Sequence, residues 1–103
     1  MLVEFDADVW VSAGEARWHF VTLPIPCAHE VAEASEGMRN GFGSVRVRAT
    51  IGSTTWETSI FPDTKADSFV LPCKKAVRKA EDLEEGDRVS VTLELLLGDM
   101  RSP

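Results

Sequence analysis

Residues 69–97 read FVLPCKKAVRKAEDLEEGDRVSVTLELLL and contain the signals of a strand, a helix and a second strand. Three apolar residues precede Pro72, which is typical of a short strand that ends where a helix begins. Apolar residues then recur at helical spacing until Gly86-Asp87 marks a turn. From Val89 onwards apolar and polar residues alternate, which predicts a long strand with one buried face. This unit predicts a β-rich fold with short helices.

The helix predicted in this unit spans residues 74–85. Its core-facing positions, taken from helical spacing, are Ala76, Val77, Ala80 and Leu83. Its outer side carries four basic residues, Lys74, Lys75, Arg78 and Lys79.

An earlier stretch, residues 20–37, resembles the first half of this unit. Both stretches have a short apolar strand, a proline, a cysteine, and a valine four residues after the cysteine. Each then has acidic residues and a glycine before the next strand, so a helix is predicted over residues 27–36. The resemblance favours a barrel of two halves related by a pseudo-twofold axis. The alternative is chance, because helices that follow Pro and end at Gly are common.

A first hairpin is predicted from residues 2–11 and 16–22, joined by a four-residue turn. In this register Trp18 and Phe20 face the core, and Trp10 points outward. The expected cross-strand pairs are Val11–Ala16, Val9–Trp18, Ala7–Phe20, Trp10–Arg17 and Asp8–His19.

A second hairpin is predicted from residues 45–51 and 54–61, joined by a two-residue turn at Gly52-Ser53. This register places Trp56 and Ile60 in the core. The expected cross-strand pairs are Ile51–Thr54, Ala49–Trp56 and Arg48–Glu57.

The composition indicates a small folded domain rather than a disordered chain. The 103 residues are 44% hydrophobic and 27% charged, which is ordinary for a globular domain. We expect a single domain over residues 1–98 and a tail over residues 99–103. The net charge of −6 disfavours binding to nucleic acids, because such binding depends on neutralising phosphates.

The sequence also predicts a cytoplasmic protein that does not enter a membrane. No apolar run approaches the roughly 20 residues that a spanning helix needs. Acidic residues interrupt the first strand, so the chain does not open with a secretory signal. Two cysteines are fewer than a disulfide-stapled domain would carry.

No group of residues indicates catalysis, and we assign no catalytic, metal-binding or cofactor-binding residue. Cys27 and Cys73 lie near predicted helix N-termini, where a thiolate is favoured, but small apolar filler is the simpler interpretation. Two cysteines and two histidines without a C-x-x-C pair do not form a closed zinc site.

The candidate binding surface consists of charged residues on the predicted outer faces. They are Arg46, Arg48, Glu57, Lys74, Lys75 and Arg78. Such a surface would suit an acidic partner or a nucleic acid, and a solvated outer face is the alternative interpretation.

Four segments of the chain carry a family resemblance. They are Trp18-x-Phe20 with Leu23-Pro24; Val45-x-Val47-x-Ala49-Thr50-Ile51-Gly52; Thr58-Ser59-Ile60-x-Pro62; and Leu71-Pro72-x-Lys74-Lys75-Ala76-Val77-Arg78-Lys79-Ala80 with Gly86-Asp87-x-Val89. These segments resemble a bacterial domain-of-unknown-function family, some of whose members also carry a bacteriocin-protection, OmpD-associated segment. The resemblance implies a mainly β fold, a small double-split β-barrel of about six to seven strands with two short helices. The chain departs from that family in residues 63–67, which lack the usual glycines.

A shorter stretch, residues 71–91, resembles the swapped-hairpin DNA-binding domains of the AbrB and MazE type. Those domains share a Pro-x-x-x-Arg arrangement followed by Gly-Asp-x-Val. This chain differs from them in its acidic charge and in its acidic N-terminal strand.

These observations favour a non-enzymatic binding or protein-interaction module that takes an unknown protein or small ligand. One alternative is an AbrB-like nucleic-acid-associated regulator. Another is a ligand-binding or enzymatic barrel, which would have a pocket lined by Trp18 or Trp56 with Arg48 and Glu57 converging on it. A homodimer is also expected as an option, because small barrels often complete an edge with a partner strand.

Overall fold

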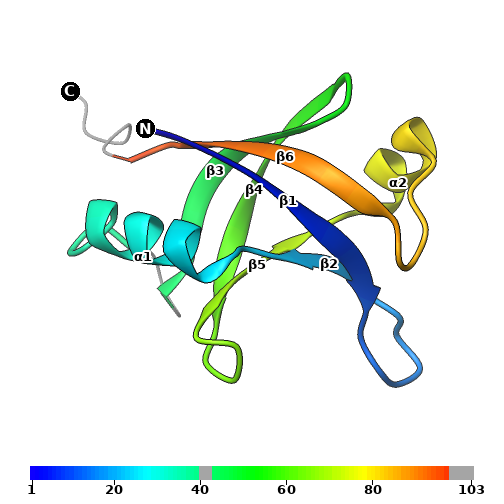
Figure 1. The fold of residues 1–103 in the computed structure, drawn as a ribbon, viewed down its shortest axis with the longest axis horizontal. Helices are drawn as coiled ribbons and strands as arrows, with labels where there is room; N and C mark the ends of the chain where they lie inside the picture. The colour runs from blue at the N-terminus through cyan, green and yellow to red at the C-terminus, as the bar shows by residue number, and fades with distance from the viewer. Residues whose placement is uncertain (40–42, 98–103) are drawn as a thin grey trace.

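The computed structural model describes residues 1–39 and 43–97, and six strands close into a barrel in the order β1-β2-β5-β4-β3-β6 (Figure 1). The elements are β1 (Leu2–Val11), β2 (His19–Thr22), α1 (Ile25–Ala34), β3 (Val45–Ile51), β4 (Thr54–Asp63), β5 (Ser68–Pro72), α2 (Lys75–Glu81) and β6 (Arg88–Leu95). Strands make up 47% of the described residues and helices 19%, which confirms the predicted mainly β barrel with two helices. The tail predicted for residues 99–103 lies outside the described residues.

Side chains from alternate positions of β1, β3 and β6 fill much of the barrel core. The inward residues of β1, β3 and β6 are Val3, Phe5, Val9, Val45, Val47, Ala49, Ile51, Val89, Val91, Leu93 and Leu95, all buried. The predicted period of two is therefore confirmed in these strands. Valine dominates because a β-branched side chain fits a pleated, half-buried surface.

The predicted register of the second hairpin is confirmed. Ile51 pairs with Thr54 across the turn, and Arg48 pairs with Glu57 further along the strands. Gly52 has φ +61°, as the first residue of a two-residue turn of this kind requires. Trp56 is half-buried and packs against the core.

The predicted register of the first hairpin is wrong. The observed pairs are Val9–Val21, Trp10–Phe20 and Val11–His19. Val9 thus lies opposite Val21 instead of Trp18, a shift by an odd number of residues that exchanges the two faces of β2. Val21 is fully buried, and Trp18 is 61% exposed.

Two features of the structure set the observed register of the first hairpin. The connection is longer than predicted, because the Ser12 N–H donates to the Trp18 carbonyl and closes a wide loop. In addition, β2 pairs with β5, where Val21 lies opposite the buried Leu71. Paired residues point to the same face of a sheet, so this partner decides which residues of β2 enter the core.

The predicted outer pairs of the first hairpin are replaced as well. Trp10 points outward as expected, but its ring lies 5.0 Å from that of Phe20 and its Nε1 donates to Thr22. Asp8 accepts a hydrogen bond from Arg88 of β6 at 3.1 Å instead of meeting His19.

Helix α1 begins at Ile25, ahead of the predicted start at Cys27. Pro26 fits the first turn, because the missing N–H has no partner there in any helix. The helix buries Ala28 and Val31, and Gly37 with φ +80° follows its end.

Helix α2 is shorter than the predicted helix over residues 74–85. It ends before Asp82, which adopts a left-handed conformation with φ +55°. Val77 is buried as predicted, but Ala76 and Ala80 are exposed. A helix of two turns on one side of the barrel presents few positions to the core, so the longer apolar stripe does not form.

The barrel consists of two halves with the same element order. The first half is β1-β2-α1-β3 and the second is β4-β5-α2-β6. Exchanging the halves reproduces the observed strand neighbours, because β2 pairs with β5 and β3 pairs with β6. The two helices accordingly lie on opposite sides of the barrel (Figure 1). The pseudo-twofold arrangement predicted from the sequence is present in the topology.

The pseudo-twofold axis passes through two cross-strand pairs. One is Val21–Leu71, between β2 and β5, and the other is Thr50–Thr92, between β3 and β6. Equivalent backbone bonds lie on either side of the first pair: Leu23 N–H to Phe69 O at 3.0 Å and Cys73 N–H to His19 O at 2.9 Å.

One prediction concerns Glu81, whose carboxylate joins α2 to the β3–β4 turn. It accepts hydrogen bonds from the Ser53 N–H at 3.3 Å and the Thr54 hydroxyl at 2.5 Å. We expect Glu81→Ala to lower the free energy of unfolding by about 1 kcal/mol, measured by urea denaturation. The matched control is Glu84→Ala, an exposed position expected to change stability by less than about 0.5 kcal/mol. Equal losses in the two variants would contradict this role for Glu81.

Candidate functional site

The charged residues of β3 and β4 form a network in which opposite charges are matched. Arg48 donates to Glu57 and to Glu94 of β6, each at 2.8 Å. The hydrogen bond to Glu57, followed by the one to Glu94, raises the pKa of Arg48 above its ordinary value. Arg46 lies 3.9 Å from Glu57 and donates to Ser59. The network is exposed, but its positive charge is already directed at neighbouring carboxylates.

The remaining residues of the predicted binding surface belong to α2 and the residue before it. Arg78 donates from Nε to the carbonyl of Cys73 at 3.1 Å, so it helps to hold the start of the helix. Lys74 and Lys75 are exposed and form no ion pair within residues 1–39 and 43–97. In that part of the chain no hydrogen bond or ion pair joins the helix to the network on β3 and β4. The six-residue surface remains a prediction, and its residues are divided between the β3–β4 hairpin and the region of α2.

Burial controls the chemistry of both cysteines more strongly than their positions near the helices. Desolvation raises the pKa of the Cys73 thiol to about 11, against a smaller lowering effect of Arg78. Desolvation, followed by the charge of Glu30, also raises the pKa of Cys27. Both cysteines are free, and both thiols are protonated at neutral pH. This agrees with their interpretation as apolar filler.

Cys73 leads to a prediction about pH. Its pKa is about 11 in the folded protein against 9.0 for an ordinary thiol, so burial favours the protonated form. The resulting stability is complete below pH 9 and is lost as pH rises towards 11, on the order of 2 kcal/mol. We expect the free energy of unfolding to fall less steeply over this range in Cys73→Ala than in the native protein. Parallel pH profiles would contradict the burial effect.

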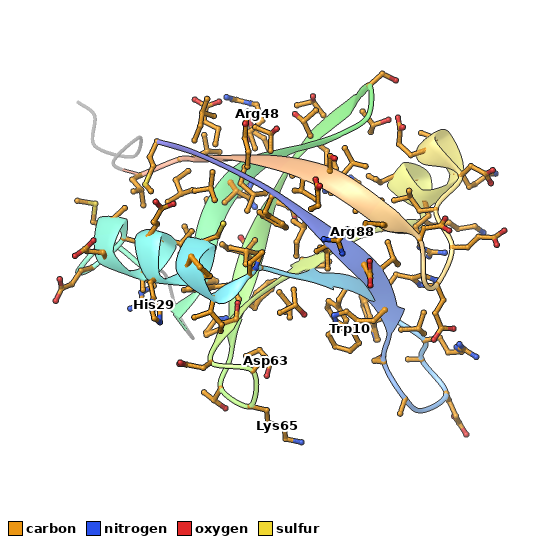
Figure 2. All side chains as sticks on the ribbon, viewed as in Figure 1. Trp10, His29, Arg48, Asp63, Lys65 and Arg88 are labelled. Atoms are coloured by element: carbon orange, nitrogen blue, oxygen red, sulfur yellow. The ribbon has the colours of Figure 1, made fainter. Side chains whose placement is uncertain are left out.

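A hollow lies between α1 and the hairpin that joins β4 to β5. Its volume is about 180 Å³, and its apolar wall includes Ala28, Ala32 and Phe69. Figure 2 shows His29 on α1 and Asp63 on the hairpin at the same lower side of the molecule, with Arg48 on the opposite side. None of Trp18, Trp56, Arg48 and Glu57 lines this hollow.

The hairpin beside the hollow is held by its own side chains. Asp63 accepts the Lys65 N–H at 3.2 Å, which forms a local turn of the kind that Asp favours. Asp67 has φ +54°, a conformation that Asp tolerates better than most residues. The buried Ser68 hydroxyl donates to the Leu23 carbonyl at 2.7 Å and so ties the hairpin to the segment before α1. The chain therefore forms this turn without a glycine in residues 63–67.

Arg39 supplies a positive charge at the hollow. Its guanidinium lies 5.7 Å from the centre of the Phe69 ring, a cation–π geometry. Within the described residues it has no carboxylate partner. Asp63 and Asp67, from the hairpin, also line the hollow. The hollow thus has cationic and hydrogen-bonding groups on its α1 side and two carboxylates on its hairpin side.

This hollow was not predicted from the sequence. Its polar residues come from two segments, 29–39 and 63–68, and neither carries a motif.

The described residues contain no group of three or more His, Cys, Asp or Glu side chains placed to hold a metal ion. Neither α1 nor α2 is long and apolar enough to cross a bilayer.

Together these features define a small closed six-stranded barrel with two helices and a polar hollow between α1 and the β4–β5 hairpin. The sequence matches the family described as a domain of unknown function (DUF1905) over residues 5–93, and the chain belongs to this family. A search among curated proteins finds no match.

Proposed function

We propose that this domain is a non-enzymatic binding module whose ligand site is the hollow beside α1. The observation that carries the proposal is the Arg39 guanidinium, which lies over Phe69 at the hollow without a carboxylate partner in the described chain. A guanidinium presents several N–H donors in a planar fork that matches a carboxylate. The ligand is therefore a small molecule or side chain that carries a carboxylate.

The size of the hollow limits the ligand. Its volume of about 180 Å³ lies below the roughly 300–1,000 Å³ typical of drug-sized ligand pockets. An acid of a few carbon atoms fits this space, with its aliphatic part against Ala28, Ala32 and Phe69. His29, from α1, adds an imidazole beside the same opening.

Binding is favoured over nucleophilic catalysis by the groups at the hollow. No cysteine lines it, and its buried serine, Ser68, already donates its proton to Leu23. The nearest thiol on α1, Cys27, has a raised pKa and is a poor nucleophile at neutral pH.

The other expectations about partners remain proposals of lesser support. A nucleic-acid-associated role would rely on Lys74 and Lys75, because Arg46 and Arg48 are opposed by carboxylates. A cytoplasmic location agrees with two free cysteines. A homodimer stays a proposal that does not rely on edge pairing, because the six described strands close into a barrel.

The proposal is tested by titrating acetate, propionate and butyrate into ¹⁵N-labelled protein and following the amide signals. We expect saturable shifts at residues 28–32 and 63–69 with millimolar affinity, the range suited to so small a ligand. Arg39→Gln should weaken binding several-fold, a loss of about 1 kcal/mol, because it removes the charge and the fork.

The matched control is Lys65→Gln. It removes a positive charge from the β4–β5 hairpin beside the hollow, at a residue that does not line the hollow. This variant should bind like the native protein. Shifts that are absent, or that weaken equally in both variants, would reject the hollow as the binding site.

A further inference from the structure

The pseudo-twofold axis gives the hollow a counterpart at the other side of the barrel. The residues that join β4 to β5 lie beside the segment that follows α1. By the same symmetry, the residues that join β1 to β2 lie beside the segment that follows α2. At the α2 side an ion pair joins these two segments: Arg17 Nη2 lies 3.5 Å from Glu85 Oε1. Opposite charges on the two segments thus meet directly at this side.

At the α1 side the same two segments carry opposite charges that do not meet. Arg39 follows α1, and Asp63 and Asp67 lie at the two ends of the β4–β5 connection. No ion pair joins Arg39 to either carboxylate within the described residues, and the hollow of about 180 Å³ lies among them. One side of the barrel is bridged by its own side chains, and the other is left open between a cation and two anions.

We infer that the ligand of this hollow is a small zwitterionic amino acid, whose carboxylate binds Arg39 and whose ammonium group binds Asp63 and Asp67. The inference rests on the proposed function, since it concerns the same site and the same carboxylate contact. The ligand completes across the hollow the charge bridge that Arg17 and Glu85 make directly at the equivalent position.

The carboxylates of the hairpin are available for an ammonium group. The Lys65 N–H uses Oδ1 of Asp63 and leaves Oδ2 free of any described partner. The Asp67 side chain accepts no hydrogen bond from the described residues and is held at the hollow by the turn itself. The ammonium group has three N–H donors, which is enough to reach both carboxylates and water.

The physical advantage of a zwitterion is that one binding event makes both contacts. Each contact alone is a solvent-exposed ion pair worth roughly 0–1 kcal/mol. Once one end of the ligand is bound, the other end is held close to its partner at a high effective concentration. A ligand with both charges should therefore bind more tightly than a derivative that lacks either one.

The test uses the full chain and compares glycine, β-alanine and 4-aminobutyrate by amide-signal titration. Two derivatives of the tightest-binding amino acid serve as probes. The N-acetyl derivative has no ammonium charge, and the carboxamide, which keeps a free amino group, has no carboxylate. We expect the zwitterion to bind at least about tenfold more tightly than either derivative, a difference of about 1.4 kcal/mol.

Two variants assign the ends of the ligand. Arg39→Gln should weaken the zwitterion and the N-acetyl derivative but leave the carboxamide unchanged. Asp67→Asn should weaken the zwitterion and the carboxamide but leave the N-acetyl derivative unchanged. Both positions are exposed, so both variants should keep the native unfolding midpoint, and Lys65→Gln serves again as the control.

The outcomes separate this inference from the proposed function. Equal affinities for the zwitterion and its N-acetyl derivative would overturn the inference and leave a carboxylate site in place. Failure of every carboxylate to bind would overturn both. Tight binding of the zwitterion that survives Asp67→Asn and the double change Asp63→Asn with Asp67→Asn would also overturn the role of the hairpin.

Discussion

The pairing of β2 with β5 is the constraint on which the rest of the structure depends. Each of these short strands has a hairpin partner on one side and meets the other half of the chain on the other side. Val21 and Leu71, opposite each other at the centre of this pair, are both fully buried. The contact therefore closes the barrel and also decides which residues of the two hairpins enter the core.

The pairing of β2 with β5 also relates the two halves of the barrel by a pseudo-twofold axis, which gives the hollow a counterpart at the α2 side. Symmetry places each helix, and the segment after it, beside the connection of a hairpin. At the α2 side Arg17 and Glu85 close the space, while at the α1 side Arg39 and the carboxylates of the hairpin leave it open. A difference between two otherwise equivalent places is a stronger pointer to function than a hollow considered alone.

The surface charges show why net charge and clusters of basic residues are weak guides to function. Arg48 lies between two carboxylates, and Arg88 bonds to Asp8 on the neighbouring strand. These contacts follow from cross-strand register, which sets opposite charges side by side on the outer face. The cation at the hollow, Arg39, stands out because its nearest described partner is an aromatic ring.

The sequence by itself determined the long strands, the second hairpin and the order of elements in both halves. Alternation with a period of two gives one buried face, and the two-residue turn at Gly52-Ser53 admits a single register for the strands beside it. These signals are local, so they can be read without knowing what lies opposite. The buried face of β1 and the burial of Val77 follow in the same way.

The tertiary structure alone decided the register of the first hairpin, the length of α2 and the position of the hollow. Which residues of β2 face the core depends on β5, about fifty residues away in the chain, because paired residues must share a face of the sheet. The hollow needs α1 and the β4–β5 hairpin to be brought together, and neither segment carries a motif that predicts the other. Contacts between distant segments form only when the barrel closes, which is why no local pattern encodes them.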